Sequence, residues 1–293
     1  MTVLHFNDFI KAFDEQTEKI IFVDEQERLS YEHDFLKTYL KSKSKRHDYY
    51  DRYIEVFRGL SPRQVKKHLS QSMTLDLDIK LEFLLYAPCS FIVKAEDEQI
   101  ELIAKQYIDP DENLIEEHLI GATRKDGFEK SYPYLGSIYM RNIVALFGAI
   151  DYDQVTIPAP VFDGYKHWLK MGFMLRENAW PNIQKNIAQL IKRTVHSKNR
   201  DSLISRFLKS GPRVLNALAI DKGEQATELF KDFQKTNATI NPVLCGEEYY
   251  FDLKSKRQRS MLKSFCKRRL ISPPDYKNER GYSRSIKSKK LMT

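Results

Sequence analysis

The residues that could perform chemistry lie on and just after one predicted strand, Leu114–Ile120. That strand carries two adjacent carboxylates, Glu116 and Glu117. A loop follows it, and the apolar pattern of Ser137–Ile150 predicts a helix. The first turn of a helix has N–H groups without intrahelical acceptors and a partial positive charge, so it can hold a phosphate group. The sequence therefore places two acidic side chains on the strand that leads into a candidate anion site.

The elements around this strand predict a sheet of mixed direction. After the helix, Gln154–Ala159 is predicted as a strand and Asp163–Met171 as a short helix, so a βαβ unit is expected. Before it, Leu75–Phe83 alternates between apolar and polar residues, as a half-buried strand does. Ser90–Lys94 and Gln99–Ile108 are predicted as two more strands. Together they form an antiparallel meander that leads into the βαβ unit.

Helices are predicted on both flanks of this sheet. Residues 1–72 are expected to be helical, with one helix beginning near Tyr31. The Tyr, Lys and Arg residues of 45–58 could form a base-stacking surface, but their one-sided spacing favours a helix packing its aromatic face on a neighbour. After residue 173 the patterns predict helices from Trp180 and over Asp201–Lys209, Val214–Ala219, Glu224–Phe233 and Lys256–Lys267, and an edge strand over Tyr249–Leu253.

Three segments carry a family resemblance: Leu135–Arg141, Val155–Ala159 and Gly164–Phe173. Together they resemble the acetyl-coenzyme-A-binding half of the GCN5-related N-acetyltransferase (GNAT) superfamily. They are most similar to its divergent members in bacterial effector-type and phage-associated proteins. The resemblance covers residues 75–175 well and extends faintly to residue 267. It implies a GNAT-like fold with acetyl-coenzyme A as cofactor, and it does not cover the N-terminal helical part.

The resemblance implies a cofactor site where the helix starts after the loop. In the superfamily, backbone N–H groups there wrap the coenzyme pyrophosphate, in a pattern of Gln or Arg, two variable residues, Gly, one variable residue, and Gly or Ala. The matching segment is Ser131–Gly136, which keeps the last glycine and has Tyr134 in place of the first. The implied cofactor-binding residues are Leu135, Gly136, Ser137 and Ile138. The alternative is that Gly136 and Ser137 only cap a helix.

Acyl transfer to an amine requires a general base, because the amine must lose a proton before it attacks a thioester. The resemblance implies Glu116 or Glu117 for this role, with His118 as the next candidate. Successive strand residues face opposite ways, so the two glutamates cannot both point into the site. The alternative is that both are surface carboxylates on a strand edge.

The family also uses a tyrosine hydroxyl to protonate the leaving thiolate. Trp168 stands at the corresponding position here, and an indole N–H is hardly acidic. Tyr165, one helical turn earlier, is the substitute that the sequence offers. The alternative is that Trp168 and Phe173 are core residues that hold their helix on the sheet.

These patterns predict an α+β fold with a GNAT-like mixed, mostly antiparallel sheet and flanking helices. The expected domains are a helical N-terminal region over 1–72, a GNAT-like domain with a helical C-terminal extension over 73–267, and a basic, disordered tail over 268–293.

The net charge of +8 is concentrated near the C-terminus. From Lys254 onward the acidic residues are Asp275 and Glu279 alone, whereas the two signs nearly balance elsewhere. A basic tail can bind RNA, anionic lipid or an acidic partner, and the alternative is a solvated end. Because the charge excess belongs to the tail, we do not expect the fold itself to bind nucleic acid.

The compartment is predicted from cysteines and hydropathy. No apolar run approaches the ~20 residues of a membrane span, and residues 1–8 lack the layout of a signal peptide. Widely spaced cysteines, without a metal-ligand pair, are typical of reduced thiols in a cytoplasmic protein; they are Cys89, Cys245 and Cys266. We expect a cytoplasmic protein, or one translocated into a host cell.

Two functions remain open. The first is an acyltransferase that moves an acetyl or acyl group from coenzyme A to an amine of a protein or small molecule. The second is a catalytically inactive GNAT-like scaffold, such as a bacterial effector, that engages a host or partner protein through its N-terminal helices.

Overall fold

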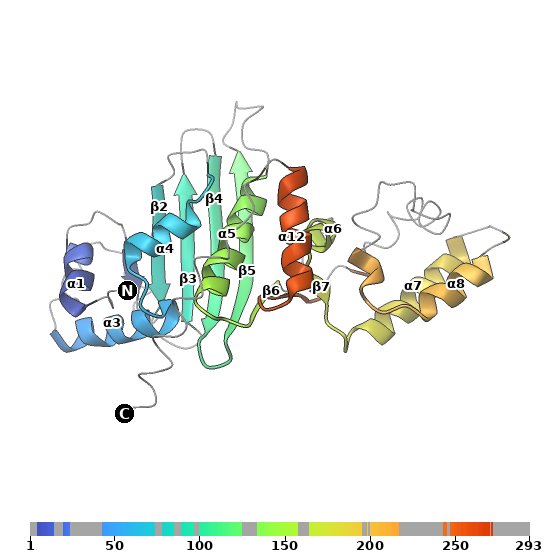
Figure 1. The fold of residues 1–293 in the computed structure, drawn as a ribbon, viewed down its shortest axis with the longest axis horizontal. Coiled ribbons are helices and arrows are strands. Elements are labelled where there is room, and N and C mark those ends of the chain that lie inside the picture. The colour runs from blue at the N-terminus through green and yellow to red at the C-terminus, as the bar shows by residue number, and fades with distance from the viewer. Residues whose placement is uncertain are drawn as a thin grey trace. The chain divides into compact units, whose positions relative to one another are not determined.

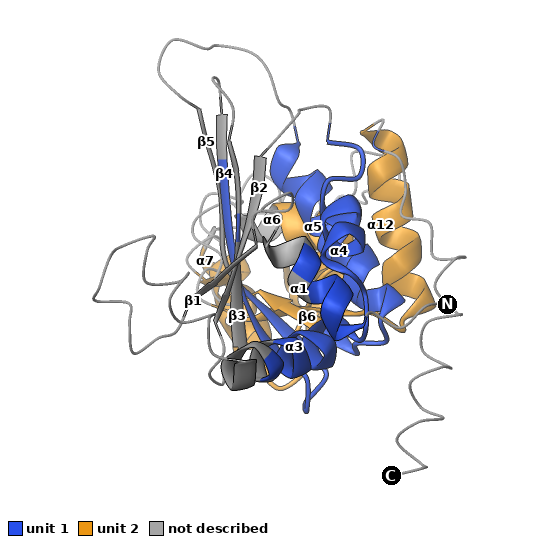
Figure 2. Cartoon of the chain, turned by 90° about the vertical axis from the view of Figure 1, so that its left-hand side faces the viewer, with its two compact units in different colours: residues 1–154, 270–293 blue, residues 155–269 orange. Residues whose placement is uncertain are grey.

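The computed structural model (Figure 1) describes residues 5–14, 20–23, 43–73, 78–84, 89–96, 100–124, 134–157, 164–194, 198, 200–216, 243–244, 247–269 and 271. The chain divides into two compact units (Figure 2). Unit 1 comprises residues 1–154 with 270–293, and unit 2 comprises residues 155–269.

Unit 1 is built on an open, mostly antiparallel sheet of five described strands. The strands are β1 (Ile20–Val23), β2 (Asp78–Leu84), β3 (Cys89–Glu96), β4 (Ile100–Asp109) and β5 (Leu114–Arg124), in that spatial order. β1 runs parallel to β2, and β2 to β5 pair antiparallel. The predicted α+β class and the mixed, mostly antiparallel sheet are therefore confirmed.

The helical prediction for residues 1–72 is wrong at one segment. Ile20–Val23 forms strand β1, whose Ile20 lies opposite Leu81 of β2. Its residues are β-branched or aromatic, which favours a strand, and four residues are too few for a helical face. The helices described in this region are α1 (Phe6–Asp14), α3 (Lys43–Phe57) and α4 (Pro62–Leu69). The helix predicted near Tyr31 lies outside the described residues.

The aromatic face of α3 packs against α1. The Phe6 ring stacks on His47 with centroids 3.9 Å apart, and Phe9 lies 5.2 Å from the Tyr53 ring. Tyr53 and Phe57 are buried. The packing interpretation of this aromatic face is confirmed, because these rings are covered by neighbouring helices and cannot stack on bases.

Helix α5 (Leu135–Ala149) is apolar nearly all round and lies, with α1 and α4, on one side of the five-strand sheet (Figure 2). Its buried Asn142 Nδ2 donates to the Leu69 carbonyl at 2.7 Å and to the Gln71 carbonyl at 3.0 Å. Arg141 Nη2 also donates to the Gln71 carbonyl, at 2.9 Å. These bonds satisfy carbonyls at the C-terminus of α4 and fix that helix on α5.

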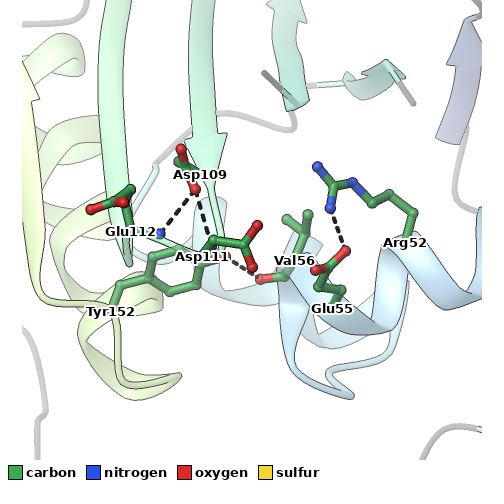
Figure 3. A network of polar contacts seen from close by, with 7 residues as sticks. All are labelled: Arg52, Glu55, Val56, Asp109, Asp111, Glu112 and Tyr152. Atoms are coloured by element: carbon green, nitrogen blue, oxygen red, sulfur yellow. Dashed lines mark hydrogen bonds and ion pairs between the residues drawn. The ribbon is translucent and has the colours of Figure 1, made fainter. Parts of the chain in front are cut away.

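Polar contacts close the turns at one end of unit 1 (Figure 3). The buried Tyr152 hydroxyl donates to the Val56 carbonyl of α3 at 3.0 Å. In the β4–β5 turn, Asp109 Oδ1 accepts from the N–H groups of Asp111 and Glu112 at 3.0 and 2.9 Å. The aspartate thus supplies the local bonds that shape this turn.

Arg58 ties three of these turns together. Its guanidinium donates to Asn113 Oδ1 and, at 3.2 Å, to the Asp151 carbonyl, and lies 4.6 Å from the centre of the Tyr152 ring. Arg58, Asn113 and Asp151 all have positive φ, of 48°, 53° and 66°. Such backbone is costly for non-glycine residues and persists where surrounding bonds hold it.

Unit 2 contains mainly helices. Its described elements are β6 (Gln154–Ile157), which begins at the unit boundary, α6 (Gly164–Met171), β7 (Met174–Leu175), α7 (Trp180–Thr194), α8 (Arg200–Leu208), β8 (Tyr249–Asp252) and α12 (Lys256–Arg268). The predicted helices α6, α7, α8 and α12 and the strand β8 are confirmed, but β8 is not an edge strand, because it lies between β6 and β7. β7 pairs antiparallel with β8 and was not predicted, because two residues carry no periodic signal. The predicted helix over 224–233 and the chain from residue 272 lie outside the described residues.

The turn after α6 is held by buried side-chain amides. Gly172 has φ +105°, and a Cβ there would lie 2.9 Å from the Gln258 carbonyl oxygen, so only glycine fits. Gln258 Nε2 donates to the Gly172 carbonyl at 2.9 Å. Asn216 Nδ2 donates to the carbonyls of Leu169 and Phe173 at 3.0 and 2.6 Å. The carbonyls that end α6 are therefore satisfied inside the unit.

Candidate functional site

The acidic strand contains a β-bulge at the position of the candidate residues. Lys105 of β4 pairs with Leu119 of β5, and the next residue, Gln106, pairs with Glu117, so His118 has no partner in β4. Bulges of this kind re-aim side chains and are frequent beside active sites. The His118 side chain is outside the described part of the chain.

The bulge brings Gln106 directly opposite Glu117 inside the core. Gln106 Nε2 donates to both carboxyl oxygens of Glu117, at 2.7 and 3.0 Å. Glu117 is 3% exposed and Gln106 is 0% exposed. Burial raises the pKa of the Glu117 carboxyl well above its ordinary range, and the Gln106 hydrogen bond opposes this rise only in part.

Tyr139 of α5 completes this buried cluster. Its pKa is raised well above the ordinary value by burial and then by the negative charge of Glu117, against a lowering by Gln106. Gln106 Oε1 has no hydrogen-bond partner among the described residues. Burial favours the protonated form of Glu117, which can donate as well as accept a hydrogen bond, whereas an ionised carboxylate only accepts. The arrangement therefore favours a neutral carboxylic acid.

The two candidate carboxylates face opposite sides of the sheet. Ile115 and Glu117 are buried, whereas Glu116 between them is half-buried and lies opposite Tyr107. The alternation expected from sequence is therefore confirmed. Of the two, Glu116 is the carboxylate with access to solvent, and Glu117 belongs to the helix-covered face.

The start of α5 has the features of an open helix terminus. Its N-cap residue is Tyr134, whose side chain makes no capping bond, and its first turn contains no acidic residue. The N–H of Ile138 donates to the Tyr134 carbonyl at 2.9 Å, so it is used inside the helix. The N–H groups of Leu135 and Gly136, at the first two helical positions, have no acceptor within the helix. Ser137, the remaining expected cofactor residue, is buried.

Tyr134 has φ 78° and ψ 16°, which is left-handed backbone. Glycine adopts this conformation readily, and for other residues it costs about 1–2 kcal/mol. Tyr134 is 36% exposed.

Tyr165, the expected donor to the thiolate, and Trp168, which stands at the family's tyrosine position, lie in unit 2 on α6. The Trp168 ring meets the fully buried Phe173 ring edge-on, with centroids 5.8 Å apart. This contact confirms that both aromatic residues pack within unit 2. Tyr165 lies in the first turn of α6, and its side chain is outside the described part of the chain.

Sequence reasoning missed Gln106 and Tyr139. A signal for Gln106 was present, because Leu102, Ala104 and Ile108 are buried at the same phase of β4 and a polar residue interrupts their alternation. A polar residue at a buried phase needs a partner, and its pairing opposite Glu117 supplies one. The sequence around Tyr139 contains no such signal, because a tyrosine is common on the apolar face of a helix and does not interrupt the pattern.

Comparison with known proteins adds no family to this description. No family model matches the chain, and neither a curated protein nor a solved structure was found to be similar to it. Within the described ranges, no group of three or more His, Cys, Asp or Glu side chains could hold a metal ion. No described helix is both long and apolar enough to cross a membrane.

Proposed function

We propose that this protein is a GNAT-like acyltransferase that binds acyl-coenzyme A at the start of α5. The observation that carries the proposal is the left-handed backbone of Tyr134, at the position of the superfamily's first glycine. Left-handed tyrosine costs free energy, and such strain is concentrated at functional sites. The N–H groups of Leu135 and Gly136 would bind the coenzyme pyrophosphate, aided by a first helical turn without acidic residues.

The acceptor is an amine of a protein or small molecule, and Glu116 is the better placed general base. The bound coenzyme supplies the activated thioester. The amine nitrogen forms a bond to the thioester carbonyl carbon, the carbon–sulfur bond breaks, and the thiolate leaves as coenzyme A. Glu116 accepts the proton of the amine, since it is half-buried on the accessible face of β5. The thiolate takes up a proton from solvent.

A second candidate is a GNAT-like scaffold that has lost catalysis and engages a partner protein. It is favoured by the buried Glu117, because the hydrogen bonds from Gln106 give this carboxyl a structural role that requires no catalysis. The packing of Trp168 on Phe173 favours it too, because an indole occupies the expected position of the tyrosine donor. In this reading the helices α1, α3 and α4 supply the partner surface, as a translocated bacterial effector would require.

Calorimetry with acetyl-coenzyme A tests the cofactor site. Gly136→Glu adds a negative charge and bulk at the helix N-terminus and should weaken binding at least about 100-fold by repelling the phosphates. Gly211→Glu is the matched control, because a Cβ at Gly211 meets no atom within 4 Å. Tyr134→Gly should bind at least as tightly as the native chain, since it restores the glycine of the pattern. An absence of binding by the native chain at millimolar ligand would refute the cofactor site.

Release of free thiol in the presence of amine acceptors then separates the two candidates. Glu116→Gln should slow turnover at least about 100-fold with little change in coenzyme affinity, as expected for a general base. Glu117→Gln should leave turnover within a few-fold of the native rate. Binding of the coenzyme without turnover by any variant would support the scaffold instead.

A further inference from the structure

Helix α12 (Lys256–Arg268) has two faces of different chemistry. It contains six basic residues and no acidic one. Its buried face is formed by Gln258, Leu262, Phe265 and Cys266. Five of the six cations are exposed: Lys256, Arg257, Lys263, Lys267 and Arg268. Much of the charge that the sequence suggested for a tail therefore belongs to a folded helix.

The exposed cations form two rows along α12. At 100° per residue, Lys256, Lys263 and Lys267 fall on one line of the helix surface, and Arg257 and Arg268 fall on another. The exposed Ser260 and Ser264 lie between the rows. The rows extend about 16 Å at 1.5 Å per residue. This surface offers ammonium, guanidinium and hydroxyl donors in a strip.

Helix stability explains only Lys267 and Arg268, which lie in the last turn, where the helix dipole favours positive charge. Lys256 and Arg257 occupy the first turn, where the helix dipole disfavours positive charge. Lys263 and Lys267 are four residues apart, so their like charges repel on the same face. None of the five exposed cations forms an ion pair with a described residue. The cations of the first turn therefore destabilise the helix, as expected of a surface that binds a ligand.

The neighbourhood of α12 within unit 2 is also positive. His167 of α6 lies edge-on to Phe265 of α12, with ring centroids 5.4 Å apart. Its pKa is lowered to about 4 by burial first, and then by the charges of Arg269 and Lys170. The nearby acidic residue Asp252 is engaged by the backbone, since its Oδ1 accepts from the N–H groups of Lys254 and Ser255.

The geometry selects among the polyanions that such a surface could bind. An interfacial membrane helix inserts its apolar face, but the apolar face of α12 is already covered within unit 2. Proteins that bind single strands stack bases on aromatic side chains, and the exposed face of α12 has none. The phosphate backbone of a duplex is read by donors alone, because phosphate oxygens only accept.

We propose that the exposed face of α12, formed by Lys256, Arg257, Lys263, Lys267 and Arg268, binds the phosphate backbone of duplex nucleic acid without sequence preference. This differs from the expectation from sequence that the fold itself does not bind nucleic acid. The reason is that the charge was assigned to a tail, whereas α12 holds it in rows on a packed helix. The proposal is independent of the proposed acyltransferase activity.

Fluorescence anisotropy of the full chain with a short mixed-sequence DNA duplex and its RNA counterpart tests this proposal. If all five cations contact phosphates, the plot of log K against log salt should have a slope of about −4.5 or steeper. The double variant Lys263→Gln/Lys267→Gln should reduce the magnitude of the slope by about 1.8. From counterion release alone, it should weaken binding about 60-fold at about 0.1 M salt.

The matched control is Lys185→Gln/Lys192→Gln, which removes the same charge from exposed positions of α7 in the same unit. Its changes in salt slope and in affinity should be much smaller than those of the Lys263→Gln/Lys267→Gln variant. The tail of residues 270–293 is present in every variant and contributes equally. Thermal unfolding confirms that each variant is folded.

Three results would overturn the proposal. Equal weakening by the α7 and α12 double variants would show that net charge, and not this face, controls binding. Polyaspartate competing as strongly as duplex at equal charge concentration would indicate an acidic protein partner. Loss of binding to phosphatidylserine vesicles in the α12 variant, with duplex binding unchanged, would indicate a lipid surface.

Discussion

Replacing Glu117 by glutamine tests whether the buried carboxyl of unit 1 is neutral. The side chains have nearly the same shape, and the introduced amide keeps an oxygen for the Gln106 Nε2 donor. The substitution therefore removes a titratable proton while keeping the volume and hydrogen bonds of the cluster.

The direction in which stability changes with pH follows from the difference in the Glu117 pKa between the folded and unfolded states. Burial raises the pKa of Glu117 above its ordinary value of 4.5 in the folded state, so the folded chain binds up to one proton more than the unfolded chain. The native protein then loses stability as the pH rises above 4.5, until the folded pKa is reached. One proton corresponds to a slope of at most about 1.4 kcal/mol per pH unit.

Urea unfolding followed by circular dichroism, from about pH 4 to about pH 9, measures this difference. Glu117→Gln and the native chain should have equal stability at the lowest pH, and the variant should become increasingly more stable above it. The control is Glu116→Gln, the same change at the adjacent position on the other face of β5. A variant that is less stable by a constant amount at every pH would refute the reasoning, because it would show an ionised, favourably bound carboxylate.

Three further substitutions test the packing by chemical denaturation. Gly172→Ala should cost at least about 2 kcal/mol, because its Cβ would lie 2.9 Å from the Gln258 carbonyl oxygen at φ +105°; a cost below about 0.5 kcal/mol would contradict this geometry. Arg58→Ala should cost about 2 kcal/mol through the lost bonds to Asn113 and Asp151, whereas Arg52→Ala, which removes a partly exposed ion pair on α3, should cost at most about 0.5 kcal/mol. Tyr152→Phe should cost about 1 kcal/mol for its buried bond to a carbonyl of α3, and no loss would show that water replaces it.

Local patterns were enough to predict most elements of the sheet and its helices. The strands β3 and β4 were predicted to within two residues at each end. The alternation of apolar and polar residues predicted β2, because it reports which side of a strand is buried, although β2 begins three residues later than expected. Ser61 followed by Pro62 is a sequence pattern typical of a helix start, and the structure shows a capping box there, at the beginning of α4. The strand Ile20–Val23 was missed, since four residues contain too little pattern to be distinguished from a helical turn.

The candidate site was predictable only in part. The sequence predicted that Glu116 and Glu117 lie on opposite faces of a strand and that Gly136 lies at a helix start. Both predictions depend only on residues that are close in the chain. It could not place Gln106 opposite Glu117, because that pairing depends on the register of two strands and on the bulge at His118.

The sequence by itself determined the order of the elements, the alternation within each strand and the basic character of the segment Lys256–Arg268. The tertiary structure decided three further properties. It sealed Glu117 beneath α5, gave Tyr134 a left-handed backbone, and buried the apolar face of α12 so that its cations form an outward surface. Burial, register and backbone strain depend on what packs against a residue, and segments distant in the chain supply those neighbours.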